Sequence, residues 1–179
     1  MKSKDLTRIA LIAAVYVVIT ILLAPISYSV VQVRLSELLT LLPYFMGYPA
    51  VIGLFVGVAV ANFFGGLGII DIVFGSLITL LAAYFTARAS SLYRAGIYPV
   101  VFNAVGIGLI LFFVLEIRLI SLTAEEIIFL SRDISGFLEG AVNYLLHVLS
   151  VGVGQFIAVY IIGIPVMKLL NKKMDLKNL

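Results

Sequence analysis

The stretch Glu139-Gly-Ala-Val-Asn143-Tyr-Leu-Leu-His147-Val-Leu-Ser150-Val-Gly-Val-Gly-Gln155 decides the fold class, because it is an apolar segment with polar residues at helical spacing. Side chains at i, i+4 and i+8 share one face of a helix, so Glu139, Asn143 and His147 form a stripe that continues toward Gln155. Polar side chains are costly inside a bilayer and usually face the interior of a helical bundle. The stripe therefore predicts a polar pocket within a helical membrane protein.

The composition of the whole chain supports a membrane location. Of its 179 residues, 63% are hydrophobic and 12% are charged, and the mean hydropathy is +1.22. A soluble domain has about half apolar and about a quarter charged residues. We expect a single all-α membrane domain over residues 1–179. Its six predicted transmembrane helices lie at about 6–24, 36–47, 49–64, 72–90, 96–115 and 140–168.

Charge distribution favours six spans over five. The second and third spans are short and meet at Gly47-Tyr48-Pro49, so a single kinked span is the alternative. With six spans, one side receives nine of the twelve basic residues, namely Lys2, Lys4, Arg8, Arg88, Arg94, Lys168, Lys172, Lys173 and Lys177. Lys and Arg gather on the cytoplasmic side of membrane proteins. We predict a multi-pass plasma-membrane protein with both termini in the cytoplasm.

The same sequence excludes several classes of function. There is no cysteine and only one histidine, which leaves no thiolate or multi-histidine metal site. The phosphate-binding pattern G-x-x-x-x-G-K-[ST] is absent, so the chain is not itself a P-loop ATPase. The topology explains the net charge of +3, which does not indicate nucleic-acid binding. We expect neither an enzyme nor a metal or cofactor site.

Polar residues in the other spans add candidates for the pocket. Glu37 stands three residues after Arg34 and is either a candidate ligand contact or the partner of Arg34 in an ion pair at the headgroup level. Asp71 either contacts a ligand or caps the helix that follows it. An amide such as Asn103 serves equally as a contact between helices or as a ligand contact. The candidate substrate-binding residues are Glu139, Asn143, His147, Asp71, Glu37, Asn62, Asn103 and Gln155.

Three further features bear on the architecture. The glycines of Gly65-Gly-Leu-Gly68 permit a tight reversal before the fourth span. The long outer connection 116–139 contains a capping-box pattern at Thr123, and its short helix either covers the pocket as a lid or rests on lipid headgroups. Ala10 and Ala14 form a small-xxx-small pair on the first span, which suits close packing against another helix of this chain or of a partner.

Two stretches resemble a known family. The first is Val31-Gln-Val-Arg-Leu-Ser-Glu-Leu-Leu-Thr-Leu-Leu-Pro-Tyr-Phe45, and the second runs from Asn62 through Gly65-Gly-Leu-Gly68 to Asp71-Ile-Val-Phe-Gly-Ser-Leu-Ile-Thr79. Together they resemble the QueT family, which are predicted substrate-binding S-components of energy-coupling factor (ECF) vitamin transporters assigned to queuosine precursors. The length, the six spans and the topology agree over nearly the whole chain.

This resemblance implies a six-helix bundle like that of the riboflavin-type S-components, with the substrate bound near the outer face. It implies as partners an ECF transmembrane coupling subunit and two ATP-binding subunits, which use the ATP, so this chain needs no cofactor. It also implies that Ala10 and Ala14 contact the coupling subunit.

The implied substrates are 7-deazaguanines, whose edge presents two adjacent N–H donors that a carboxylate accepts. We predict Glu139 for this edge with Asn143 beside it, and Asp71 as a second carboxylate for a cationic aminomethyl group. Alternatives are an S-component for another vitamin, a self-sufficient secondary carrier, and a purely structural membrane subunit. An intramembrane enzyme using Glu139 and His147 would lack a nucleophile.

Overall fold

The computed structural model describes residues 3–27, 34–114 and 132–176, and every regular element in these ranges is a helix. The prediction of an all-α protein is confirmed for this part of the chain. The elements, in chain order, are α1 (Ser3–Leu22), α2 (Ala24–Ser27), η1 (Leu35–Leu41), α3 (Leu42–Met46), α4 (Tyr48–Gly65), η2 (Asp71–Gly75), α5 (Ser76–Thr86), α6 (Leu92–Leu109), η3 (Ile110–Val114), α8 (Arg132–Phe156), η4 (Ile157–Gly163) and α9 (Ile164–Met174).

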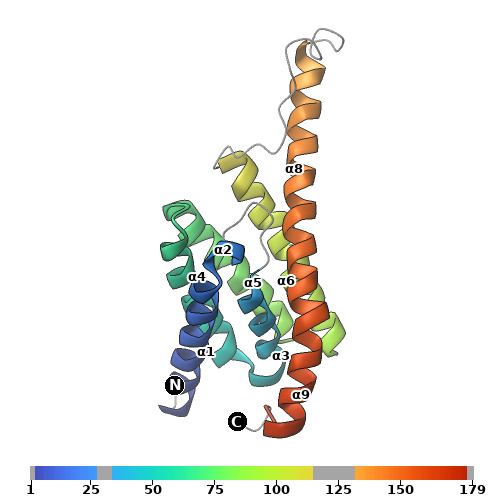
Figure 1. The fold of residues 1–179 in the computed structure, drawn as a ribbon. Coiled ribbons are helices and arrows are strands. Elements are labelled where there is room, and N and C mark those ends of the chain that lie inside the picture. The colour runs from blue at the N-terminus through green and yellow to red at the C-terminus, as the bar shows by residue number, and fades with distance from the viewer. Residues whose placement is uncertain (1–2, 28–33, 115–131, 177–179) are drawn as a thin grey trace.

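Four helices of the described chain are long and apolar enough to cross a membrane. They cover Ser3–Leu22, Tyr48–Gly65, Leu92–Phe112 and Leu138–Met174, and two shorter apolar helices cover Leu35–Met46 and Asp71–Thr86. Large apolar side chains such as Leu11 and Leu149 point out of the bundle, where they suit a lipid environment. Helix α1 begins and α9 ends at the same end of the bundle (Figure 1).

The second and third apolar segments are separate helices rather than one kinked helix. Helix α3 ends at Met46, and the chain reverses at Gly47 before α4 begins at Tyr48 (Figure 1). Gly47 has a φ of 64°, in the left-handed region that favours glycine. Pro49 lies in the first turn of α4, where its missing N–H costs no hydrogen bond.

Helices α1 and α4 pack closely because α4 has glycines at the contact. A Cβ atom added to Gly57 would lie 3.1 Å from both the Cα of Ala13 and the Cβ of Tyr16. The face of α1 that packs against α4 therefore includes Ala13 and Tyr16. Ala10 and Ala14, by contrast, lie on the exposed face of α1.

The last helical run, α8 to α9, extends from Arg132 to Met174 without interruption and begins earlier than the predicted span 140–168. The N-terminal part of α8 projects beyond the other helices (Figure 1). The run widens into the π-helical turn η4 just before Pro165, whose ring nitrogen has no hydrogen for the carbonyl of Ile161. The lid helix predicted near Thr123 falls outside the described residues.

Basic and aromatic side chains meet at the end of the bundle where α9 finishes. Arg88 donates a 2.7 Å hydrogen bond to the hydroxyl of Tyr48, and its guanidinium lies 3.6 Å from the ring centroid of Tyr84. Lys168 donates a 2.8 Å bond to the hydroxyl of Tyr93. Such Tyr and Lys or Arg clusters are typical of a membrane–water interface.

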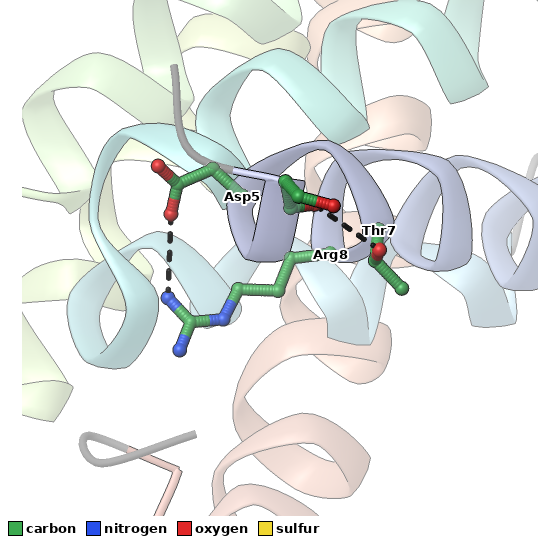
Figure 2. Close-up of polar contacts among 4 residues, drawn as sticks. Asp5, Thr7 and Arg8 are labelled. Carbon is green, nitrogen blue, oxygen red and sulfur yellow. Dashed lines mark hydrogen bonds and ion pairs between the residues drawn. The ribbon is translucent and has the colours of Figure 1, made fainter.

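The first turns of α1 carry two local contacts. The Arg8 guanidinium lies 3.7 Å from the Asp5 carboxylate, and the Thr7 hydroxyl donates to the Ser3 carbonyl at 3.2 Å (Figure 2). A half-buried ion pair between neighbouring turns near the surface contributes about 0–1 kcal/mol, so it adds little to the stability of the bundle.

Candidate functional site

A polar cavity lies inside the bundle where η1, α4, η2, α5, α6 and α8 meet. Its volume of about 20 Å³ is enough for a water molecule. A bicyclic base is larger, so binding one requires the lining side chains to move apart. The residues that line the cavity are Arg34, Glu37, Val58, Asn62, Gly75, Thr79, Asn103, Ile107, Val151 and Gln155.

Glu37 forms the centre of the site. Its side chain is 2% exposed, and one carboxylate oxygen accepts a hydrogen bond from the hydroxyl of Tyr16, which is fully buried. The other oxygen accepts from the amide nitrogen of Asn103 at 3.2 Å. The Gln155 side chain lies beside this carboxylate and helps to stabilise it. Two helices thus supply hydrogen bonds to one carboxylate, as burial of such a group requires.

The second feature of the site is a pair of side-chain amide oxygens, those of Asn103 and Gln155. Within the described chain, Asn103 Oδ1 and Gln155 Oε1 are buried and have no hydrogen-bond partner. Buried polar atoms are almost always paired with protein or water. These two acceptors therefore mark a place where a further donor fits.

A second set of contacts connects Arg34 to Asp71. Arg34 donates to Asn62 Oδ1 at 2.8 Å and to the Ser27 carbonyl at 3.2 Å. Asn62 in turn donates to the backbone carbonyl of Asp71 at 3.0 Å. The positive charge of Arg34 attracts the carboxylates of both Glu37 and Asp71. Arg34 thereby balances part of the negative charge in the site.

Asp71 lies buried at the start of η2, with 2% of its surface exposed. Asp71 lies in the first turn, where its charge favours the helix N-terminus, although no side-chain capping hydrogen bond is formed there. Asp71 Oδ2 is buried and has no hydrogen-bond partner among the described residues. A buried carboxylate oxygen without a hydrogen-bond partner is a candidate contact for a cationic group.

Gly75 allows these groups to approach one another. A Cβ atom added at this position would lie 2.8 Å from the amide nitrogen of Asn62 and 3.1 Å from Asp71 Oδ1. The π-helical turn Asp71–Gly75 is wider than an α-helical turn, and such turns are frequent at functional sites.

The structure brings together part of the predicted site. Glu37, Asn62, Asn103 and Gln155 line the cavity, and Asp71 adjoins it through its contact with Asn62. The Asn103 bond to Glu37 shows that this amide does connect two helices.

The N-terminal part of the α8 stripe lies elsewhere. Glu139, Asn143 and His147 are not among the described residues that line the cavity. The Asn143 amide donates to the Glu139 carbonyl of its own helix at 3.1 Å. His147 is 2% exposed, and its ring centroid lies 6.3 Å from that of Phe112. Their predicted roles in binding stay predictions.

Sequence reasoning did not include three residues that belong to this site. Tyr16 was overlooked because tyrosines of membrane helices usually lie at the interface; its position well inside the first span was the available signal. Arg34 was interpreted only as a partner of Glu37. Thr79 lines the cavity, and its hydroxyl donates to the Gly75 carbonyl of its own helix at 3.2 Å.

Metal binding finds no support in the described ranges, where no three His, Asp or Glu side chains come together. The site instead offers hydrogen-bonding groups within an apolar bundle, which suits recognition of a small polar molecule.

Comparison with known proteins gives one match. No curated protein and no solved structure matches the chain significantly. A family model described as QueT transporter matches residues 6–172, nearly the full length. This confirms the resemblance noted from the two sequence stretches, and it identifies a family of transporters rather than enzymes. The chain belongs to the QueT transporter family.

Proposed function

We propose that this protein is the substrate-binding S-component of an ECF importer and that it captures a queuosine precursor, a 7-deazaguanine base, for ATP-driven uptake. The observation that carries this proposal is the polar cavity around Glu37 in a member of a transporter family. A binding subunit needs such a site, in which polar groups fixed by a rigid bundle recognise the ligand.

The sequence supports a partner-dependent mechanism. It contains no phosphate-binding loop, so the energy of ATP has to come from other subunits. Buried apolar side chains, including Leu41, Leu54, Val159 and Met167, form the core of the bundle beside the cavity. An apolar core of this kind favours a site that opens to one face over a polar path through the bundle.

Helix α1 offers a surface for the coupling subunit. Ala10 and Ala14 are exposed on the face of α1 turned away from Gly57, and small side chains allow another helix to approach closely. We propose that this surface binds the transmembrane coupling subunit, which acts with two ATP-binding subunits.

The proposed orientation places both termini in the cytoplasm. The start of α1 and the end of α9 lie at one end of the bundle (Figure 1). Lys168 of α9 contacts Tyr93 at the start of α6, and Arg88 contacts Tyr48 at the start of α4. The positive-inside rule assigns this end to the cytoplasm. The six short and long apolar helical runs then form a bundle of the riboflavin-transporter-like type.

The polar groups of the cavity suit a 7-deazaguanine. The guanine-type edge needs acceptors for N1–H and for the exocyclic amine, and the cavity has the oxygens of Glu37, Asn103 and Gln155. A cationic aminomethyl substituent needs a carboxylate, which Asp71 provides through Oδ2. Movement of the long Arg34 side chain would enlarge the cavity for the base.

A binding and transport experiment tests the proposal. The full chain in lipid nanodiscs is titrated calorimetrically with 7-aminomethyl-7-deazaguanine, its 7-cyano counterpart, guanine and riboflavin. We expect binding of the deazaguanines and not of riboflavin. Liposomes containing the chain alone should take up no substrate, whereas addition of the coupling and ATP-binding subunits with internal ATP should give uptake.

Other outcomes lead to different conclusions. Uptake by the chain alone would indicate a secondary carrier. Binding of riboflavin or another vitamin in place of the deazaguanines would overturn the substrate assignment.

A further inference from the structure

We infer that Glu37 acts on the ligand indirectly, by fixing the amides of Asn103 and Gln155 so that their carbonyl oxygens receive two N–H groups from one edge of the ligand. The inference rests on the proposed function of the cavity and adds which atoms recognise the ligand. In this arrangement Glu37 is a positioning residue.

The carboxylate of Glu37 is already engaged. Tyr16 and Asn103 donate to its two different oxygens, and the Gln155 side chain adjoins it. Because only 2% of Glu37 is exposed, a ligand has little access to the carboxylate itself. Both donors come from helices of the bundle, which holds the group in place.

This engagement decides how the two amides are turned. A side-chain amide has an NH2 end that only donates and an oxygen that only accepts. Asn103 turns its NH2 end toward Glu37, since Nδ2 donates to Oε2. Because an ionised carboxylate only accepts, we infer the same orientation for the Gln155 amide beside it. Their oxygens are consequently directed away from Glu37.

Both oxygens are left without a partner in the described structure, although both residues line the cavity. Other amide and guanidinium donors of the site are engaged with protein acceptors: Asn62 with Asp71, and Arg34 with Asn62 and Ser27. The wall of the cavity thus contains two unpaired acceptors, which a ligand reaches when the lining side chains move apart. A ligand edge with two adjacent donors, as in a 2-amino-4-oxopyrimidine ring, complements them.

Replacement of Glu37 by Gln gives a specific test. The new amide has one accepting oxygen, and its NH2 end needs an acceptor, which the Tyr16 hydroxyl supplies in the single variant. The change is therefore made together with Tyr16→Phe. One of the two amides then turns its oxygen toward residue 37 and its NH2 toward the cavity. The pair of acceptors becomes one acceptor and one donor, which suits a 2-oxo edge better than a 2-amino edge.

The experiment compares 7-deazaguanine with 7-deazaxanthine, which has an oxygen in place of the 2-amino group. Dissociation constants are measured by calorimetry on the full chain in nanodiscs. Unmodified protein should prefer 7-deazaguanine by about tenfold or more. Relative to Tyr16→Phe alone, the double variant Tyr16→Phe/Glu37→Gln should move the ratio of the two dissociation constants by about tenfold or more toward 7-deazaxanthine. Asp5→Asn, an acid-to-amide change at the exposed start of α1, is the matched control and should leave the ratio unchanged (Figure 2).

A second variant guards against poor folding of the double variant. Gln155→Met keeps the length of the side chain and removes its acceptor oxygen, so the preference for the 2-amino ligand should fall. If both variants weakened the two ligands equally and kept the ratio, the inference would be wrong, because a merely structural role has that effect.

The ligand panel separates this inference from the proposed function. A 2-amino-4-oxopteridine has the same donor edge on a different ring. Binding of this compound without any deazaguanine, with the same dependence on Glu37, would overturn the substrate and support the inference. If the deazaguanines bind with an affinity that does not depend on the 2-amino group, the proposed function stands and the inference is wrong. If none of these ligands binds, the proposed function and the inference are both wrong.

Discussion

The hydroxyl of Tyr16 in α1 donates a hydrogen bond to the carboxylate of Glu37 in η1, and both side chains are buried. One turn further along α1, the hydroxyl oxygens of Thr20 and Ser36 lie 2.6 Å apart in a second contact between these elements. The segment that carries Glu37 is therefore attached to α1 by two polar contacts. The same helix exposes Ala10 and Ala14 on its other face, so one helix adjoins both the cavity and the proposed partner surface.

We predict that Tyr16→Phe destabilises the protein and weakens ligand binding. The ring stays, but Glu37 loses one of its donors within an apolar environment, which should lower the free energy of unfolding by about 1–3 kcal/mol. The measurement is thermal unfolding in detergent together with calorimetric titration. Tyr98→Phe is the matched control, because it retains the ring that stacks on Phe85 at 5.6 Å. Equal melting temperatures for the two variants would contradict the role of the Tyr16 hydroxyl.

Thr86→Val should destabilise the protein without affecting the ligand. Pro99 lies inside α6 and has no N–H for the carbonyl of Ala95, four residues earlier. The Thr86 hydroxyl donates to this carbonyl at 3.2 Å and so satisfies it from α5. Loss of the bond should cost about 1–3 kcal/mol of unfolding free energy.

The matched control for this change is Thr7→Val, because the Thr7 hydroxyl bonds to Ser3 at an exposed position. Its melting temperature should stay close to that of the unmodified protein. A change in ligand affinity for Thr86→Val would show that the α5–α6 contact also shapes the cavity.

Gly75→Ala should reduce ligand affinity. The added methyl would come within 2.8 Å of the Asn62 amide, so Asn62 or the turn Asp71–Gly75 has to shift. Overpacking of this kind costs about 1–3 kcal/mol. At Gly140, a Cβ atom would lie 3.6 Å from its nearest described neighbour, so Gly140→Ala is the control. If both variants bound the ligand as tightly as the unmodified protein, the Asn62–Asp71 contact would not matter for binding.

The positions of the helices were largely predictable, whereas their convergence on one cavity was not. Long apolar runs predicted α1, α4 and α6 within a few residues, because helix length is set by membrane thickness. The polar stripe of α8 turns slowly around the helix, so Gln155 reaches the cavity while Glu139 does not line it in the described structure. Packing at glycines and other tertiary contacts decide which turn of the stripe faces the other helices. The periodicity of the sequence holds no information on these contacts.

A comparison of Asp71 with Glu139 tests whether the ligand binds at the Glu37 cavity or at the N-terminal half of α8. Sequence reasoning assigned the guanine edge to Glu139, whereas the cavity adjoins Asp71, whose Oδ2 lacks a partner in the described chain. We expect Asp71→Asn to weaken 7-aminomethyl-7-deazaguanine by about tenfold or more and the neutral 7-cyano compound much less, because only the first carries a positive charge. Glu139→Gln should change both affinities by less than about threefold. A large loss for Glu139→Gln with none for Asp71→Asn would place the ligand at the N-terminal half of α8 and not in the Glu37 cavity. No change in either variant would exclude both carboxylates from the binding site.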